Sequence, residues 1–377
     1  MPHFISTLFK DHFFRVLFGY YLVLSVFWAW NNLNELTDTL SSYIFGGLYP
    51  LLAVAGGIGG FIYSRKYGGW KSALGRGVIF VSLGLLAQAI GQFIWTYYNL
   101  ILEVDIPYPS VADLFYEALP FLNIAGMFYF ARAAGAQFSL RSAKNWPIAI
   151  LIPLGLLIGS YFFFLQGYEL NWDNPLTVIL DFGIQLGEAL ILSAAILTFL
   201  LSRKYLGGIM RDKIWFVSVA FLIQYLTDFS FLYMNSQGLY VNGGVVDFFY
   251  MTSFLFMSSA LIFIAKYQVE RVRVEAQAQD VTGTWRRRDK VATLIVKEQV
   301  SIIGPLAWEE ASQVAGLSVD RETGEIYLLE DKPQEILERL VERYERVFGQ
   351  TAREVSRDAV RRFASELSDT EIPASLR

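Results

Sequence analysis

Eight apolar runs, each long enough to cross a lipid bilayer, constrain the fold of this chain more than any other feature. A transmembrane helix needs about 20 predominantly apolar residues. Of the 377 residues, 54% are hydrophobic, which is too apolar for an ordinary soluble domain. The sequence therefore predicts an all-α integral membrane protein with eight transmembrane helices, near Phe14–Trp30, Tyr43–Tyr63, Gly77–Tyr98, Ser110–Ala131, Trp146–Gln166, Pro175–Leu201, Lys213–Met234 and Val245–Ala265.

The loops between these runs alternate in charge. The second, fourth and sixth loops are basic, whereas the other four loops contain no Lys or Arg. Basic loops remain on the cytoplasmic side of a membrane, so we expect both termini to be cytoplasmic. The basic loop residues are Arg65, Lys66, Lys71, Arg76, Arg132, Arg141, Lys144, Arg203, Lys204, Arg211 and Lys213.

The two halves of the membrane region share a series of short matches in the same order. Four runs make one unit, and because four is an even number the two units have the same orientation. We predict two parallel four-helix repeats, residues 1–140 with spans one to four and residues 141–266 with spans five to eight. The matches are Ser64-Arg65-Lys66-Tyr67 with Ser202-Arg203-Lys204-Tyr205, Phe80-Val81-Ser82 with Phe216-Val217-Ser218, Gln88 with Gln224, and Asp113-x-Phe115-Tyr116 with Asp247-x-Phe249-Tyr250.

The region after the last run differs sharply in composition. Residues 267–377 hold more than half of the charged residues of the chain. We expect residues 267–288 to form a juxtamembrane signalling helix or linker, with a short helix–helix seam. Residues 289–377 are predicted to form a small cytoplasmic domain. The seam consists of Val269, Val272 and Ala276.

The cytoplasmic domain is predicted to be mainly α-helical. One short β-hairpin is expected where Leu317–Asp320 and Glu325–Leu329 flank a turn. An amphipathic helix is expected to begin at Pro333 and to end at Gly349.

Six carboxylates interrupt the apolar runs, and no Lys, Arg or His lies well inside a run to neutralise them. An ionised, unpaired carboxylate in lipid is costly, so each must be protonated, hydrogen-bonded, exposed to water or bound to a cation. We predict a polar pocket in the outer half of the membrane that binds a small ligand, a cation or protons. The alternative is that these groups only hold the bundle together. The binding candidates are Glu117, Asp181, Gln185, Glu188 and Asp228.

Other polar residues in the runs are expected to have structural roles. A carboxylate in the first turn of a helix caps the N-terminus and suits the helix dipole. Tyr and Gln side chains form hydrogen bonds between membrane helices. Glu117 has no counterpart in the second half, where Met251 stands, so it is favoured for a specific role. Capping or interhelical hydrogen bonds are assigned to Ser110, Asp113, Tyr116, Asp247, Tyr250, Gln88 and Gln224.

The residue types present exclude several chemistries. The chain has no cysteine, and its two histidines, His3 and His12, precede the first run. Disulfides, thiolate sites and bis-histidine haem are therefore excluded. The sequence contains no glycine-rich phosphate-binding loop. We predict a non-enzymatic protein with no cofactor, no metal and no nucleic-acid partner.

The stretch Pro107–Glu117, preceded by Gln92-x-x-Trp95, resembles polytopic sensor regions of prokaryotic signalling proteins, the kind fused to diguanylate cyclases or histidine kinases. The resemblance covers about residues 75–135 and implies a multi-helix input module in a prokaryotic cell membrane, but it assigns no ligand. This chain departs from those proteins because it lacks either output enzyme. The matching positions are Ser110, Ala112, Asp113 and Tyr116.

Three functions are compatible with these features. In the first, a membrane sensor detects a ligand at its outer face and relays the signal to a cytoplasmic protein that binds residues 289–377. In the second, a secondary transporter rocks its two halves around the polar groups, and the cytoplasmic domain regulates it. The third is a scaffold whose bundle anchors the domain to the lipid bilayer. The seam after the last run also leaves a homodimer open. Few prolines and an outer position of the polar groups favour the sensor.

Overall fold

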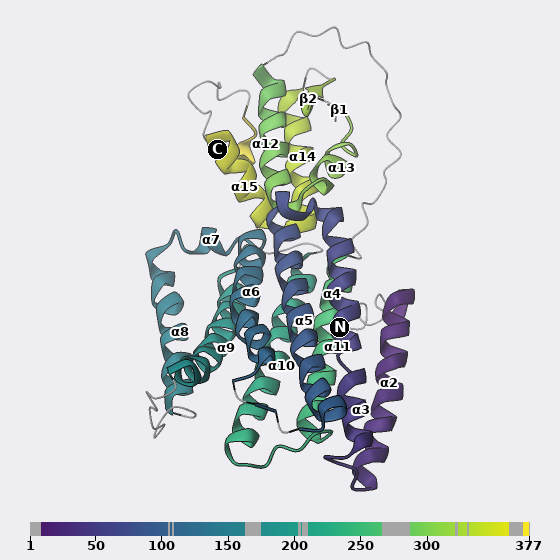
Figure 1. The fold of residues 1–377 in the computed structure, drawn as a ribbon. Coiled ribbons are helices and arrows are strands. Elements are labelled where there is room, and N and C mark those ends of the chain that lie inside the picture. Colours follow the sequence, from purple (N-terminus) through teal and green to yellow (C-terminus); the bar gives the residue numbers. More distant parts are fainter. Residues whose placement is uncertain are drawn as a thin grey trace.

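The computed structural model divides the chain into a helical bundle and a smaller C-terminal domain at one end of that bundle (Figure 1). It describes residues 9–104, 106–107, 109–162, 175–202, 205, 210–265, 287–320, 323–329, 332–361 and 372–376. The predicted juxtamembrane segment falls almost wholly outside these residues.

The bundle is built from long apolar helices. They are α2 (His12–Leu33), α3 (Leu40–Leu48), α4 (Leu51–Ser64), α5 (Ala73–Tyr97), α6 (Val111–Ala133), α8 (Trp146–Ser160), α9 (Pro175–Ser202), α10 (Met210–Ser236) and α11 (Val245–Ala265). Short segments join some of them, namely η1 (Arg65–Tyr67), η2 (Gly69–Lys71), η3 (Tyr98–Leu102), α7 (Ala136–Ser139) and η4 (Ala143–Asn145).

Seven segments of the described chain are long and apolar enough to cross a membrane, with α3 and α4 counted together. In α9 the apolar stretch among the described side chains is shorter, Leu186–Ser202. The chain is therefore a multi-pass membrane protein by helix length and composition, as the sequence predicted. The full count of eight spans stays a prediction.

The second span is broken, whereas the sequence suggested one continuous helix. The break lies at Tyr49–Pro50, between α3 and α4. Proline lacks the backbone N–H that would continue the helical ladder. Backbone groups inside a membrane need a partner within the protein, and the Tyr20 hydroxyl donates to the Leu48 carbonyl at 2.9 Å. A side chain of α2 thus satisfies the backbone at the break.

Helix neighbours follow a crossed pattern. Helix α4 packs on α5 and also on α11, while α9 packs on α10 and also on α6. Helices α2 and α8 lie at opposite edges of the bundle (Figure 1). Close approach of α4 and α11 depends on Gly56, because a Cβ there would overlap with the side chain of Ser258.

The edge helices present apolar side chains to the surroundings. In α2, Val23 and Val26 are exposed, and in α8, Ile150 and Leu151 are exposed. An aqueous surface rarely carries apolar patches of this extent. Their exposure is compatible with contact to the lipid bilayer.

The C-terminal domain packs four helices and a hairpin around one core. Its elements are α12 (Arg287–Ile303), α13 (Leu306–Ala311), β1 (Leu317–Asp320), β2 (Glu325–Leu328), α14 (Pro333–Phe348), α15 (Gln350–Arg361) and η7 (Ala374–Leu376). Strands β1 and β2 pair antiparallel, with Leu317 opposite Leu328. The predicted hairpin is therefore present, and so is the helix bounded by Pro333 and Gly349.

Two crossed hydrogen bonds fix the helices of this domain. Gln299 of α12 donates to the Ala352 carbonyl of α15 at 2.7 Å. Tyr344 of α14 donates to the Ala307 carbonyl of α13 at 2.8 Å. Burial raises the pKa of the Tyr344 hydroxyl well above its usual value, so this group keeps the proton that it donates. The buried ion pair of Arg343 with Glu310 lies between α13 and α14.

Candidate functional site

A cavity of about 360 Å³ lies among α5, α6, α10 and α11, and α9 contributes one residue to it. It lies toward the end of the bundle that is remote from the C-terminal domain, next to the α5–α6 and α10–α11 connections. Its walls combine aromatic rings with carboxyl and amide groups. The lining residues are Gln88, Gln92, Trp95, Ile106, Pro107, Ser110, Asp113, Tyr116, Leu119, Glu188, Asp228, Phe231, Leu232, Asn235, Tyr240, Asp247, Tyr250 and Phe254.

The first carboxylate of the cavity, Asp113, belongs to the N-terminus of α6. Ser110 and Asp113 form a capping box, in which the Ser110 hydroxyl is 3.0 Å from the Asp113 carboxylate and also accepts from the Ala112 N–H at 3.2 Å. Such a cap satisfies backbone donors that the first helical turn leaves free. The Oδ2 atom of Asp113 is therefore engaged locally by Ser110.

Asp247 has the equivalent place in α11. Its carboxylate accepts from the Gly243 N–H at 2.6 Å, from the Tyr240 hydroxyl at 3.1 Å and from the Tyr49 hydroxyl at 3.5 Å. Tyr49 comes from the break between α3 and α4. This carboxylate thus ties three parts of the bundle together at one point.

Glu188 and Asp228 form a carboxyl pair at the deep side of the cavity. Asp228 accepts from the Gln224 amide at 2.8 Å and from the Tyr250 hydroxyl at 2.9 Å. Glu188 lies next to it and lines the same cavity. Two neighbouring buried carboxyl groups repel each other when both are ionised, so protonation of one of them stabilises the pair. A singly protonated pair with one negative charge is the state that this arrangement favours.

One oxygen of this pair has no partner. Glu188 is only 5% exposed, and its Oε2 atom is buried without a hydrogen-bond partner among the described residues. A buried acceptor of this kind is unusual, because buried polar groups are almost always satisfied. Glu188 therefore has spare acceptor capacity at the wall of a cavity.

Aromatic rings surround the carboxyl pair. The Trp95 ring lies edge to face with Tyr116, Phe231 and Tyr240, at centroid distances of 6.3, 5.9 and 6.3 Å. Phe231 also contacts Tyr250 at 6.1 Å. The buried Trp95 Nε1–H has no acceptor among the described residues. The side chains of the wall thus include aromatic rings, a donor without an acceptor (Trp95 Nε1–H) and an acceptor without a donor (Glu188 Oε2) among the described residues.

The same hydrogen bond occurs in both halves of the bundle. In the first half, the Tyr116 hydroxyl donates to the Gln92 side-chain oxygen at 3.3 Å. In the second half, Tyr250 donates to Asp228. The Tyr116 ring fits because residue 91 is glycine, where a Cβ would lie 2.6 Å from the ring. Gln92 and Asp228 hold matching positions three residues before Trp95 and Phe231.

The structure gathers most of the predicted polar residues at this cavity. Gln224 lies behind it and is held by Asp228 and by the Ser253 hydroxyl. Glu117 lies outside the lining, against Gly183 of α9. The side chains of Asp181 and Gln185 are not among the described ones, so their place is not assigned.

Sequence reasoning missed several contributors to the site, among them Phe231, Tyr240 and Tyr49. Phe231 could have been found, because it is the counterpart of Trp95 in the repeat pattern. Tyr240 lies in the connection before α11, and Tyr49 lies at a helix break. Neither of these two carries a sequence signal, since their contacts with Asp247 depend on how distant segments meet.

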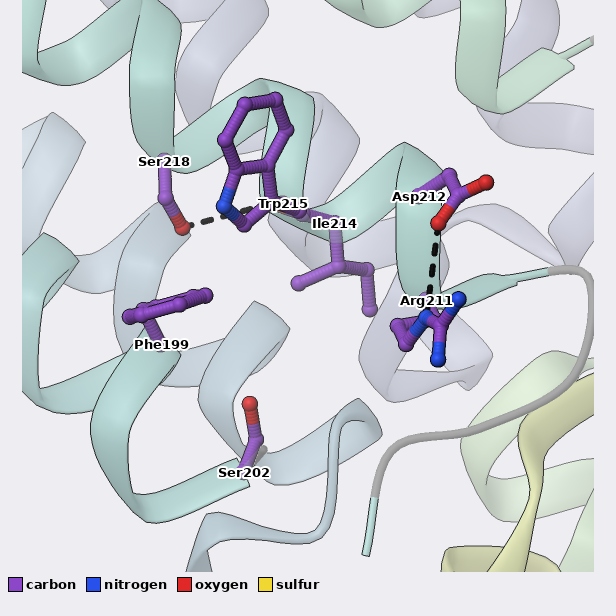
Figure 2. A pocket seen from close by; sticks show the side chains of 7 residues that line it. All are labelled: Phe199, Ser202, Arg211, Asp212, Ile214, Trp215 and Ser218. Carbon is purple, nitrogen blue, oxygen red and sulfur yellow. Dashed lines mark hydrogen bonds and ion pairs between the residues drawn. The ribbon is translucent and has the colours of Figure 1, made fainter. Parts of the chain in front are cut away.

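A second hollow, at the opposite end of the bundle, lacks these features. It has a volume of about 260 Å³ and lies between the end of α9 and the start of α10 (Figure 2). Its Arg211 and Asp212 pair with each other at 3.4 Å, and both are largely exposed. The Ser218 hydroxyl donates to the Ile214 carbonyl. No lining residue of this hollow that the structure describes has a buried polar atom without a partner.

The C-terminal domain contacts the bundle at two separate turns. At the first, Gly304 lies so close to Tyr67 that a Cβ would overlap with the Tyr67 carbonyl oxygen. At the second, the Thr351 N–H donates to the Tyr205 carbonyl at 2.9 Å, and its hydroxyl donates to the Ala134 carbonyl at 3.0 Å.

An ion pair adds to the second contact. The two terminal guanidinium nitrogens of Arg141, Nη1 and Nη2, donate to the Asp358 carboxylate, and the Nη1 distance is 3.1 Å. Such two-pronged pairs have defined geometry as well as charge attraction. The domain is therefore seated on the bundle by backbone contacts and by a directional ion pair, in addition to the linker in sequence.

Comparison with family models, with curated proteins and with solved structures finds no match for this chain.

Proposed function

We propose that this protein is a non-enzymatic membrane sensor, in which occupancy of the cavity beside Glu188 and Asp228 changes the seating of the C-terminal domain. The observation that carries the proposal is that this domain contacts both halves of the bundle, at Tyr67 and at Tyr205. A domain held at both places responds to any relative movement of the two halves. A domain that is only tethered would not need such contacts.

The proposal includes the duplicated architecture expected from the sequence, with eight spans in two parallel repeats. Two observations support it. The Tyr116–Gln92 and Tyr250–Asp228 hydrogen bonds occupy matching sequence positions. The crossed packing is also reciprocal, because α4 of the first half packs on α11 of the second, while α9 of the second half packs on α6 of the first.

We further propose that the C-terminal domain is itself a duplicated pair of helical units. The first unit joins α12 to α13 at Gly304, and the second joins α14 to α15 at Gly349. Gln299 and Tyr344 precede these glycines by the same number of residues, and Ala352 and Ala307 follow them by the same number. The Gln299–Ala352 hydrogen bond of one unit to the other therefore corresponds to the Tyr344–Ala307 hydrogen bond in the reverse direction.

The two duplications are matched at the interface. The first unit meets the Tyr67 turn, and α12 packs on α5 of the first half. The second unit meets the Tyr205 turn, and α14 packs on α10 of the second half. Tyr67 and Tyr205 are equivalent in the repeat pattern. The second unit also reaches the first half, because the Thr351 hydroxyl donates to the Ala134 carbonyl, so a shift between the halves would change how this unit is seated.

We further propose an orientation in the membrane and a cytoplasmic partner. With basic loops inside, the cavity is near the outer face and the C-terminal domain is in the cytoplasm of a prokaryotic cell. A cytoplasmic protein that binds residues 289–377 would receive the signal. The secondary transporter remains the second candidate, because two repeated halves around a polar centre are also the design of many transporters.

Paired spin labels test the relay, and the absence of native cysteine makes their placement simple. Lys66→Cys with Glu309→Cys reports the first contact, and Arg211→Cys with Gln350→Cys reports the second. We expect the double variant Glu188→Gln, Asp228→Asn to shift the distance distributions of both label pairs.

The matched control is Glu117→Gln, which changes a membrane carboxyl group outside the cavity lining and should leave both distributions unchanged. Unchanged distances in the cavity variant would contradict the relay. Flux measurements in liposomes separate the transporter. Proton, sodium or potassium flux that disappears in Glu188→Gln would favour transport over sensing.

A further inference from the structure

We infer that the cavity binds a small organic cation that carries both an ammonium group and an oxygen acceptor, such as an amino alcohol. This inference rests on the proposed function, because it names the ligand of the same site. It is drawn from the charge of the cavity, from its aromatic wall and from two buried polar atoms that lack partners.

Charge comes first. The described lining residues include four carboxyl groups and no Lys, Arg or His. Asp113 and Asp247 act as helix caps, and the remaining two, Glu188 and Asp228, are neighbouring buried carboxyl groups whose favoured state carries one negative charge. Burial of an uncompensated charge is costly. A ligand with one positive charge matches the carboxyl pair, whereas an anion would find no cationic partner among the described lining residues.

The available acceptor defines where the positive group binds. Glu188 Oε2 is buried, lacks a partner among the described residues and belongs to a cavity-lining side chain. Asp228 already accepts hydrogen bonds at both of its oxygens, from Gln224 and from Tyr250. An ammonium group placed against Glu188 would satisfy this oxygen and would neutralise the pair.

The aromatic wall favours an organic cation over a metal ion. Ring faces attract ammonium groups, and aromatic cages are the usual receptors for quaternary ammonium ligands. The rings of Trp95, Phe231, Tyr240 and Tyr250 contact one another around the cavity. Divalent ions need several converging oxygen ligands, and among the described residues no three acidic or histidine side chains converge to hold a metal.

The orphan donor defines the second group of the ligand. Trp95 Nε1–H is buried without an acceptor among the described residues. A hydroxyl or ether oxygen on the ligand would accept from it. The cavity volume of about 360 Å³ is large enough to hold a molecule of this size.

Isosteric probes test the inference with the full-length protein in lipid nanodiscs. Choline and 3,3-dimethyl-1-butanol have the same shape, but only choline is charged. Ethanolamine presents a primary ammonium, and tetramethylammonium lacks the hydroxyl. We expect choline or ethanolamine to bind, measured by calorimetry and by the shift in unfolding temperature, and the neutral isostere to bind roughly tenfold more weakly or not at all.

Point variants test which residue binds the ammonium group of the ligand and which binds its hydroxyl group. Glu188→Gln should weaken binding of the ammonium alcohol by roughly tenfold or more. Trp95→Phe keeps an aromatic ring and removes the donor, so it should weaken binding of the alcohol by about fivefold and leave tetramethylammonium unchanged. Glu117→Gln is the control and should bind like the wild type. If Glu188→Gln does not fold, the isosteric pair on the wild-type protein decides the question alone.

Equal binding of the neutral isostere, or binding that is insensitive to Glu188, would overturn the inference, and so would failure of every ammonium probe. Failure of the relay gives a different result. If choline binds but the spin-label distances do not change, the ligand class stands and the sensor proposal fails. If a neutral or anionic compound changes those distances, the sensor stands and this ligand class is wrong.

Discussion

The two halves of the bundle carry the same tyrosine hydrogen bond with different acceptors. In the first half, Tyr116 donates to the Gln92 amide, and in the second half Tyr250 donates to the Asp228 carboxyl group. Because an amide serves the first half, a charged acceptor is not required to hold such helices together. The two halves therefore differ in the charge of this acceptor, and only the second half places a carboxyl group next to Glu188.

The halves also differ at the cytoplasmic domain. Contact at the Tyr67 turn depends on the absence of a side chain at Gly304, whereas contact at the Tyr205 turn is a hydrogen bond from Thr351. Equivalent positions thus use shape complementarity in one half and hydrogen bonding in the other. The predictions below separate these differences, beginning with the largest effect.

Replacing the two tyrosine acceptors by leucine should affect the halves unequally. Asp228→Leu leaves the Gln224 and Tyr250 donors without their acceptor in a buried site, and we expect a loss of about 3 kcal/mol or more in the free energy of unfolding. Gln92→Leu removes the acceptor of Tyr116 alone and should cost about 1 kcal/mol. Thermal unfolding of the purified variants measures both. Equal losses would show that the two halves are energetically alike.

A side chain at Gly304 should lift the first unit from the bundle. Gly304→Ala places a Cβ against the Tyr67 carbonyl and also strains a residue at φ +67°. The matched control is Gly238→Ala, where φ is +65° but nothing lies nearby. Backbone strain alone costs about 1 kcal/mol. We expect the variant at Gly304 to cost about 2 kcal/mol more than its control, with a longer distance between labels at positions 66 and 309. An unchanged distance would contradict the contact.

Reversing one charge of the Arg141–Asp358 pair should weaken the second contact modestly. Arg141→Glu places two acidic groups together, and because the Arg141 side chain is 51% exposed, we expect a loss of about 1 kcal/mol. The label pair at positions 211 and 350 should report a broader distance distribution. The swapped pair, Arg141→Glu with Asp358→Arg, should restore it. Lack of rescue would mean that the pair does not hold the domain.

The smallest stability effect is expected for Asp228→Asn, which gives the second half an amide acceptor like that of the first. Tyr250 can still donate to the amide oxygen, so unfolding should change by less than about 1 kcal/mol. Binding of choline should nevertheless weaken, because Glu188 is then the only carboxyl group of the pair and must ionise alone in a buried site. If neither choline binding nor stability changed, the charge at position 228 would be required neither for ligand binding nor for folding.

Much of the architecture follows from patterns along the chain. Long apolar runs predict the membrane helices, and alternation around a turn predicts the hairpin of β1 and β2. Pro333 and Gly349 mark the ends of α14 because proline suits a first turn and glycine tolerates the conformation that ends a helix. The recurrence of Gln and Tyr at matching positions also pointed to the residues that line the cavity.

Other features depended on contacts that no local pattern encodes. The spacing of Glu117 from Asp113 places both on one face of α6, yet Glu117 lies against Gly183 of α9 and outside the cavity lining. Tyr240 and Tyr49 reach Asp247 from a connection and from a helix break. The seating of the C-terminal domain on Tyr67 and Tyr205 likewise joins segments that are distant in sequence.

The sequence by itself determined that this chain forms a bundle of membrane helices with acidic groups that need partners, because apolar length and buried charge are properties of each segment alone. Only the tertiary structure decided which carboxyl groups meet, which one keeps a free oxygen and where the C-terminal domain rests. The reason is physical. Helices that are apolar on nearly every side carry little information about their rotation, so their neighbours, and not their own periodicity, select the face on which Glu188 lies.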